Sequence, residues 1–185
     1  VDRRGVWPRA PKRPNGDPMH RLILMRHAQA EMSAPSGGGD KARPLAPQGR
    51  TEAAAMGRAL AERGIKPDLA LVSTAARTRQ TWDQMHDAFG DVEVRDLAML
   101  YNAGADVIRS LVEGSEEEAG CLMIVAHNPG VHLLAVEYLT ESAASPAVLD
   151  RLAGGFAPGS AAIFSVDVAG RCAYEGFLTP RTGGA

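Results

Sequence analysis

Short apolar runs alternate along the chain with longer segments in which apolar residues recur at helical spacing. The runs predict strands at residues 22–25, 67–73, 92–94 and 122–126. The helical spacing predicts helices at residues 48–63, 75–89, 105–113 and 130–139. Two closing strands, 161–168 and 171–178, are joined by a short sequence typical of a hairpin turn.

This alternation defines a fold class. Strands that are apolar throughout are buried on both faces, which is typical of a largely parallel sheet covered by helices on each side. The closing hairpin adds an antiparallel edge. We therefore predict a three-layer α/β/α sandwich with a mostly parallel central sheet. In open sheets of this kind, ligands bind beyond the carboxyl ends of the strands.

Composition narrows the class of protein further. The chain has 185 residues, 45% of them hydrophobic and 23% charged, which suits one soluble globular domain. A net charge of −2 argues against a nucleic-acid or membrane-surface binder, so any affinity for anions must be local. No apolar run approaches the roughly 20 residues of a membrane helix. Cys121 and Cys172 are too few for a metal motif and are expected to be buried free thiols, as in a cytoplasmic protein.

The two ends of the chain differ from the rest. Residues 1–18 contain five basic residues and four prolines, and we expect a disordered leader there, with a basic docking tail as the alternative. Residues 181–185 are expected to form a short loose tail. The predicted domain is residues 19–180.

Cationic and imidazole side chains follow three of the predicted strands. Arg26 and His27 follow the first, Arg77 and Arg79 open the helix after the second, and His127 follows the strand at 122–126. One arginine at a strand end is usually a surface charge, and one histidine is usually structural. Their recurrence at one sheet edge favours a site for an anion or a phosphate group.

These residue types suit phosphoryl transfer. Guanidinium groups bind phosphoryl oxygens in pairs and stabilise the charge of the transition state. A neutral imidazole nitrogen is a nucleophile near pH 7. The helix that begins after Ser73 adds backbone N–H groups and the positive end of its dipole. The Gly/Pro-rich loop at 33–47 is long enough to suggest a functional role.

Four motifs in this order resemble the histidine phosphatase superfamily, which has the phosphoglycerate-mutase-like fold. They are "LMRHAQAE", "DKARPLAPQG", "STAARTRQT" and "VAHNPG", beginning at residues 24, 40, 73 and 125. Together with "FLTP" at 177–180, they are most similar to the small bacterial SixA phosphohistidine phosphatases. The resemblance covers residues 21–180 and implies a metal-independent phosphatase that needs no cofactor.

The resemblance also implies residue roles. His27 is the nucleophile that becomes phosphorylated, Arg26 and Arg77 clamp the phosphoryl oxygens, and His127 is the second histidine of the pocket. Arg43 either anchors the Gly-rich loop, which we favour, or faces the substrate. Asn128 and Arg79 lie next to these motif positions and have other interpretations. Asn128 either bonds near the pocket or belongs to a turn, and Arg79 lies off the motif, where it is expected to be solvated or ion-paired.

One feature of the wider superfamily is missing. Its mutases and many esterases carry a general-acid Glu at a position that falls near Met99 here, with Asp96 as an uncertain substitute. A general acid speeds the departure of an alkoxide leaving group by roughly 10²–10⁴-fold. A protonated imidazole leaves without such help.

We therefore predict a phosphatase for protein-borne phosphohistidine, with a histidine phosphotransfer domain as the partner that the resemblance implies. Two alternatives stay open: a phosphomonoesterase or mutase for small phosphate esters, and a non-catalytic phosphate-binding scaffold. A monomer is expected, without nucleic-acid or membrane partners.

Overall fold

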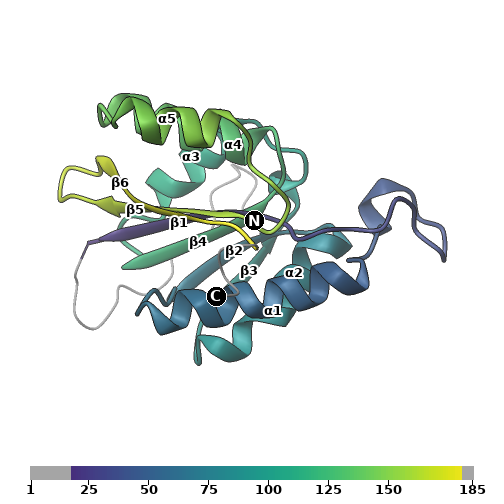
Figure 1. Cartoon of the computed structure of the whole chain (residues 1–185). Helices are drawn as coiled ribbons and strands as arrows, with labels where there is room; N and C mark the ends of the chain where they lie inside the picture. Colours follow the sequence, from purple (N-terminus) through teal and green to yellow (C-terminus); the bar gives the residue numbers. More distant parts are fainter. Residues whose placement is uncertain (1–17, 181–185) are drawn as a thin grey trace, which may run out of the picture.

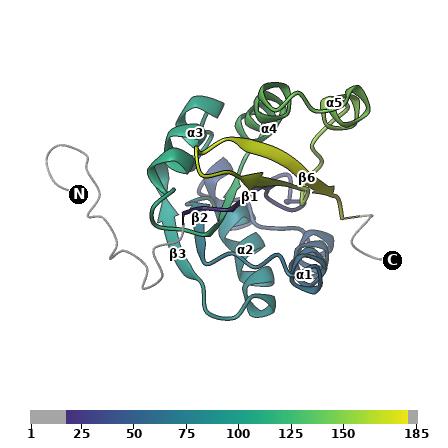
Figure 2. The same cartoon turned by 90° about the vertical axis from the view of Figure 1, so that its left-hand side faces the viewer.

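A computed structural model describes residues 18–180 of the chain. Most of the predicted leader and all of the predicted tail lie outside these residues. Helices cover both faces of a single sheet, as Figures 1 and 2 show. In Figure 2, α3, α4 and α5 lie on one side of the sheet, and α1 and α2 lie on the other.

The strands are β1 (Arg21–Arg26), β2 (Leu69–Ser73), β3 (Glu93–Leu97), β4 (Cys121–Ala126), β5 (Ala161–Val166) and β6 (Cys172–Leu178). The helices are α1 (Pro47–Glu62), α2 (Ala76–Met85), α3 (Ala105–Gly114), α4 (Gly130–Glu141) and α5 (Pro146–Ala153). Short 3-10 helices lie at η1 (Asp40–Ala42), η2 (His86–Ala88) and η3 (Ala98–Leu100).

The order of strands in the sheet is β3-β2-β4-β1-β5-β6. The pairs β3–β2, β2–β4 and β4–β1 are parallel, while β5 runs antiparallel to β1 and β6 antiparallel to β5. The predicted sandwich, mostly parallel with an antiparallel edge, is confirmed. The parallel strands β1, β2 and β4 therefore end at one edge, as the site hypothesis requires.

The two faces of β1 belong to two different cores. Leu22 and Leu24 pack with the cluster beneath α3, α4 and α5, while Ile23 and Met25 pack with the cluster beneath α1 and α2. All four side chains are fully buried. This burial explains the unbroken apolar run and fixes the position of the residues that follow it.

The predicted elements agree with the structure apart from shifts of one or two residues at several ends and three larger differences. Helix α5 was not predicted; β3 is longer than the predicted 92–94; and the helix predicted to reach residue 89 changes at residue 86 into η2. The Gly/Pro-rich loop also contains η1, which carries Asp40. This short helix brings a carboxylate to the edge where β1 and β2 end.

Two motif glycines allow close backbone approaches beside this edge. A Cβ atom on Gly49 would meet the carbonyl oxygen of Gln29, and one on Gly130 would meet the carbonyl oxygen of Ala103. Neither obstacle is a flexible side-chain end, so a larger residue would displace backbone. The glycines thus hold α1 against the loop after His27, and α4 against the loop before α3.

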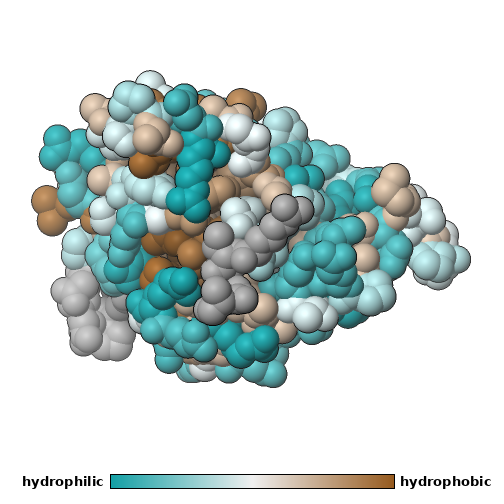
Figure 3. Space-filling view, in the orientation of Figure 1, coloured by the Kyte–Doolittle hydropathy of each residue, from teal (hydrophilic) through white to brown (hydrophobic). Residues whose placement is uncertain are grey.

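Hydrophilic residues cover most of the surface seen in Figure 3, and the hydrophobic surface on this face shows mainly between the two helical layers. Within residues 18–180, no helix is long and apolar enough to cross a membrane, and no group of His, Cys, Asp and Glu side chains could hold a metal ion. Cys121 and Cys172 are both buried and form no disulfide, as predicted.

Candidate active site

His27 lies just beyond the carboxyl end of β1 with one ring nitrogen already engaged. Its Nδ1 is 2.7 Å from the carbonyl oxygen of Ala28. A carbonyl oxygen only accepts, so Nδ1 carries the hydrogen and donates it. The lone pair of the neutral ring is therefore on Nε2. This nitrogen is the one available for nucleophilic attack.

His127 follows β4 and lies beside His27, with 5.3 Å between the ring centroids. Its Nε2 is 2.7 Å from the hydroxyl oxygen of Ser73, the last residue of β2. Its Nδ1 is buried and has no hydrogen-bond partner among the described residues. If Ser73 donates to Nε2, then Nδ1 carries the hydrogen and can donate to a phosphoryl oxygen.

Arg26 is the last residue of β1, and one nitrogen of its guanidinium group donates a hydrogen bond to the backbone. Its Nη1 donates to the carbonyl oxygen of Phe156 at 2.9 Å, and the same carbonyl accepts from the side-chain amide of Asn128 at 3.1 Å. Within residues 18–180, Arg26 Nε is buried without a hydrogen-bond partner. Buried N–H groups are nearly always paired, so this one can donate a hydrogen bond to a group that enters the site. Asn128 thus supports the site through the backbone of Phe156.

Arg77 comes from the first turn of α2 and is fixed by the loop that contains η1. Its Nη1 donates to the backbone oxygen of Asp40 at 2.7 Å, and its Nη2 donates to Asp40 Oδ2 at 3.0 Å. The Arg77 side chain is only 5% exposed, whereas that of Asp40 is 47% exposed. The loop therefore positions a buried guanidinium beside a solvent-facing carboxylate.

Two further side chains bind the Asp40 carboxylate. Arg43 Nη1 donates to Oδ1 at 2.8 Å, and the Tyr101 hydroxyl donates to Oδ2 at 2.7 Å. Arg43 Nε also donates to the carbonyl oxygen of Glu31 at 2.7 Å, so its side chain connects Asp40 with the chain near the start of the loop. The ring of Tyr101 meets His127 edge-on, with 5.6 Å between centroids. These contacts connect the loop with the histidine pair.

Burial and the neighbouring cations make both histidines weak bases. Burial, followed by the positive charges of Arg77, Arg26 and Arg43, lowers the pKa of His27 from 6.5 to about 4. Burial, followed by His27 and Arg77, lowers the pKa of His127 to about 3. Both rings are therefore neutral at pH 7. The site combines a neutral imidazole, which is chemically able to act as a nucleophile, with the guanidinium groups of Arg26 and Arg77.

Hydrogen bonds from Tyr101, Arg43 and Arg77 hold the pKa of Asp40 far below its usual range. The hydrogen bond to Asp40, conversely, raises the pKa of the Tyr101 hydroxyl. Asp40 is therefore an anion at neutral pH and cannot donate a proton. Tyr101 keeps its proton and acts as a hydrogen-bond donor.

The structure gathers Arg26, His27, Arg77 and His127 at one edge, as the sequence indicates. Arg79 lies outside this group, because it pairs with Asp96 at 3.2 Å with both side chains about half exposed. This ion pair agrees with the interpretation of Arg79, and it places Asp96 with a residue outside the histidine cluster.

The sequence reasoning missed Ser73, Asp40 and Tyr101 as members of the site. Asp40 and Ser73 stand inside quoted motifs, so motif membership was a usable signal for both. Tyr101 lies two residues past Met99 and belongs to none of the quoted motifs. Its role depends on a contact with residue 40, which is distant in sequence.

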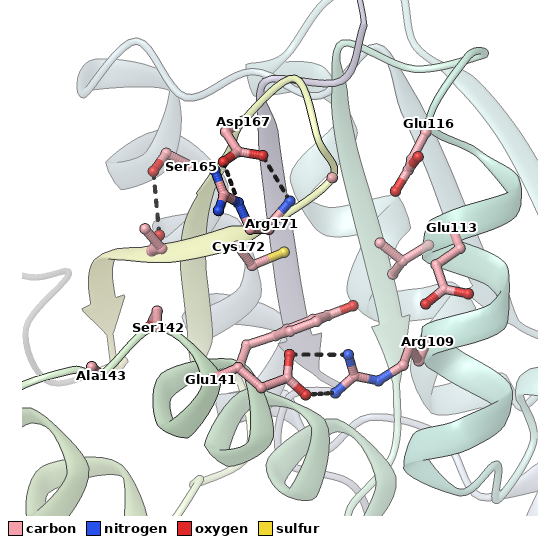
Figure 4. A pocket seen from close by; sticks show the side chains of 14 residues that line it. Arg109, Glu113, Glu116, Glu141, Ser142, Ala143, Ser165, Asp167, Arg171 and Cys172 are labelled. Atoms are coloured by element: carbon pink, nitrogen blue, oxygen red, sulfur yellow. Dashed lines mark hydrogen bonds and ion pairs between the residues drawn. The ribbon is translucent and has the colours of Figure 1, made fainter.

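A separate cavity of about 500 Å³ lies at the opposite end of the sheet (Figure 4). Its lining includes Ser165, which pairs with Arg21 at the amino end of β1. Ion pairs of Arg109 with Glu141, and of Arg171 with Asp167, stand on its walls. This cavity is therefore distinct from the site around His27.

Comparisons with known proteins agree with this arrangement. A model of the histidine phosphatase superfamily (branch 1) matches residues 22–105. An uncharacterized protein of Mycobacterium tuberculosis H37Rv is 32% identical over 163 residues, which cover 85% of this chain and all of the relative.

Two solved structures are also similar over nearly their whole length. A candidate phosphohistidine phosphatase SixA from Agrobacterium tumefaciens is 31% identical with a TM-score of 0.77, covering 88% of this chain and 99% of that chain. The corresponding candidate SixA from Nakamurella multipartitia is 32% identical with a TM-score of 0.73, covering 89% and 99%.

The fold is that of a phosphoglycerate-mutase-like protein, and a pair of neighbouring histidines lies at the carboxyl edge of its sheet. The chain belongs to the histidine phosphatase superfamily. The resemblance that the motifs indicated is thereby confirmed, and the activity at the coarse level is that of a phosphatase.

Proposed function

We propose that this phosphatase removes phosphoryl groups from phosphohistidine carried on a protein, through a covalent phospho-His27 intermediate. The observation that carries the proposal is the state of His27. Its ring is neutral at pH 7, its Nδ1 hydrogen is donated to Ala28, and its Nε2 lone pair is free beside Arg77 and His127. A nucleophile prepared in this way needs no base to activate it.

The reaction has two displacements. In the first, His27 Nε2 forms a bond to phosphorus, and the bond from phosphorus to the substrate nitrogen breaks with its electron pair on that nitrogen. In the second, a water oxygen bonds to phosphorus, the P–Nε2 bond breaks with its electron pair on His27, and one water proton passes to solvent as phosphate departs. In this proposal Arg26 and Arg77 stabilise the phosphoryl oxygens in both steps, and so does the Nδ1 hydrogen of His127 when Ser73 donates to its Nε2.

The protonation states of the side chains near His27 support a substrate whose leaving group is a nitrogen atom. The segment where relatives carry a general acid places Met99 at the surface, 49% exposed. The carboxylate that the structure does bring to the cluster, Asp40, is ionised, and the pKa of Tyr101 is raised. An alkoxide would leave without a proton donor, at a cost of roughly 10²–10⁴-fold in rate. A protonated imidazole has no such requirement.

The exposure of the site supports a substrate carried on a protein. Residues 35–41 of the Gly-rich loop are exposed, and the Asp40 side chain reaches solvent while it contacts the buried Arg77. A phosphoryl group on a protruding histidine can approach such a surface without a lid. The two SixA candidates, at 31% and 32% identity, carry a name that describes the same substrate class.

The proposal is tested with a substrate panel and a matched pair of variants. The wild-type protein is assayed on a phosphorylated histidine phosphotransfer domain and on phosphoserine, a phosphate ester whose alkoxide leaving group benefits from a general acid. We expect a kcat/KM for the phosphoprotein at least 100-fold above that for the ester. His27→Asn should abolish both activities, and His86→Asn, at an exposed histidine of η2, should change neither.

Two results would count against the proposal. Efficient ester hydrolysis without phosphohistidine hydrolysis would show that the substrate class is wrong. Substantial turnover in His27→Asn would show that the covalent mechanism is wrong.

A further inference from the structure

The Asp40 carboxylate is an unusual group to find in a site that binds phosphate. It accepts hydrogen bonds from Arg43, Arg77 and Tyr101. Anionic side chains beside an anion-binding surface weaken phosphate affinity, because like charges repel. Anchoring the loop does not require the carboxylate, since Arg77 also binds the backbone oxygen of Asp40, and Arg43 also binds Glu31. The negative charge therefore calls for a separate explanation.

The carboxylate still has room to accept another hydrogen bond. An ionised carboxylate offers about four acceptor positions. Arg43 uses one on Oδ1, and Arg77 and Tyr101 use two on Oδ2. The Asp40 side chain is 47% exposed, so a group arriving from solvent can reach it. Asp40 contacts the buried Arg77 at 3.0 Å and also reaches solvent, so the leaving group of a phosphoryl group bound by Arg77 can come close to it.

We propose that Asp40 is a specificity-determining residue that accepts a hydrogen bond from the protonated leaving group of an N-phosphoryl substrate. This inference rests on the proposed function and deepens it. A phosphohistidine ring carries a hydrogen on the nitrogen that is not phosphorylated, and the ring is positively charged in that form. A fixed carboxylate favours this cation and disfavours substrates with anionic groups at the same place.

The bonds and charges balance in this assignment. The substrate enters as a phosphorylated imidazolium, with its N–H directed to Asp40. His27 Nε2 bonds to phosphorus, and the P–N bond breaks with its electron pair on the ring nitrogen. The ring departs as neutral imidazole and keeps its N–H proton, so Asp40 neither gains nor loses a proton. Without that proton the leaving group would be imidazolate, a much poorer one.

The same arrangement explains how the site works without a general acid. An ester oxygen cannot carry a proton into the site in this way, and Asp40 has none to give it. The charge of Asp40 therefore makes the site discriminate between substrates with nitrogen leaving groups and substrates with oxygen leaving groups. Its two arginine partners and Tyr101 keep it in place and ionised.

The test compares Asp40→Asn with wild type on two small substrates, N-phosphoimidazole and p-nitrophenyl phosphate. The asparagine keeps the backbone contact with Arg77 and a side-chain acceptor, but removes the charge. We expect the ratio of kcat/KM for the P–N substrate to that for the ester to fall at least tenfold. Asp91→Asn, at an exposed carboxylate beyond η2, is the matched control and should leave the ratio unchanged.

An unchanged ratio, with both substrates slowed alike, would show that Asp40 only maintains the loop and would overturn the proposal. A raised ratio would overturn it as well. The small substrates also keep this test separate from the proposed function. If wild type ignores phosphorylated proteins and Asp40→Asn still lowers the ratio, the protein substrate is wrong and the role of Asp40 stands.

Discussion

Arg77→Lys is the substitution that tests the phosphate-binding geometry most sharply. Lysine keeps the positive charge and loses the planar fork, so it cannot bind Asp40 at two points and a phosphoryl oxygen together. A hydrogen bond between charged groups contributes about 1.5–3 kcal/mol. Losing one or two in the transition state, about 1.5–6 kcal/mol, should lower kcat/KM by roughly 10–10⁴-fold, since about 1.4 kcal/mol corresponds to tenfold.

Arg79→Lys is the matched control, because Arg79 lies on the same helix and pairs with Asp96 at the surface. Steady-state hydrolysis of the phosphoprotein measures both variants, and thermal unfolding checks that each is folded. Exposed ion pairs contribute little, so Arg79→Lys should stay within twofold of wild type. A folded Arg77→Lys protein within threefold of wild type would refute the assignment of Arg77 as a phosphate clamp. Equal losses in both variants would refute it too.

Three further predictions follow from the geometry. Because the pKa of His27 is lowered from 6.5 to about 4, an NMR titration should find its ring neutral at pH 5.5, where an ordinary histidine is mostly charged. The unfolded chain binds more protons than the folded one between those two values, so the free energy of unfolding should fall as pH drops from about 6.5 towards 4, measurable by urea denaturation. Ser73→Ala removes the 2.7 Å hydrogen bond that orients the second histidine and should lower kcat about tenfold. Gly130→Ala forces a Cβ against a backbone carbonyl and should cost about 1–3 kcal/mol in chemical denaturation, whereas Gly114→Ala, with open space around it, should cost nothing.

The parallel strands could be predicted because each contains a short run of apolar residues. The central residues of β1, β2 and β4 are all apolar, and the structure buries every one of them. Edge strand β3 (EVRDL) carries mostly exposed or half-buried residues, so its extent could not be read from an apolar run. Helix α5 fully buries only Leu152, although Pro146 at its start was a usable signal.

The site was predictable in part for the same reason. His27 and His127 directly follow buried strands, so the sheet alone brings them together. Asp40 and Tyr101 are brought in by loops, across 61 positions of sequence, and no periodicity reports such a contact. The Ser73 hydroxyl faces His127 through the register of β2 and β4, which a single sequence does not specify.

The central claim is that His27 becomes covalently phosphorylated. The most direct measurement is a rapid-quench reaction of the protein with a ³²P-labelled phosphohistidine donor protein. We expect a burst of ³²P bound to this chain. The label should be stable in alkali, be lost in acid and map to His27. His27→Asn should carry no label, while His86→Asn should label like wild type. Release of phosphate in the first turnover with no label on wild-type His27, or label at another residue, would contradict the account.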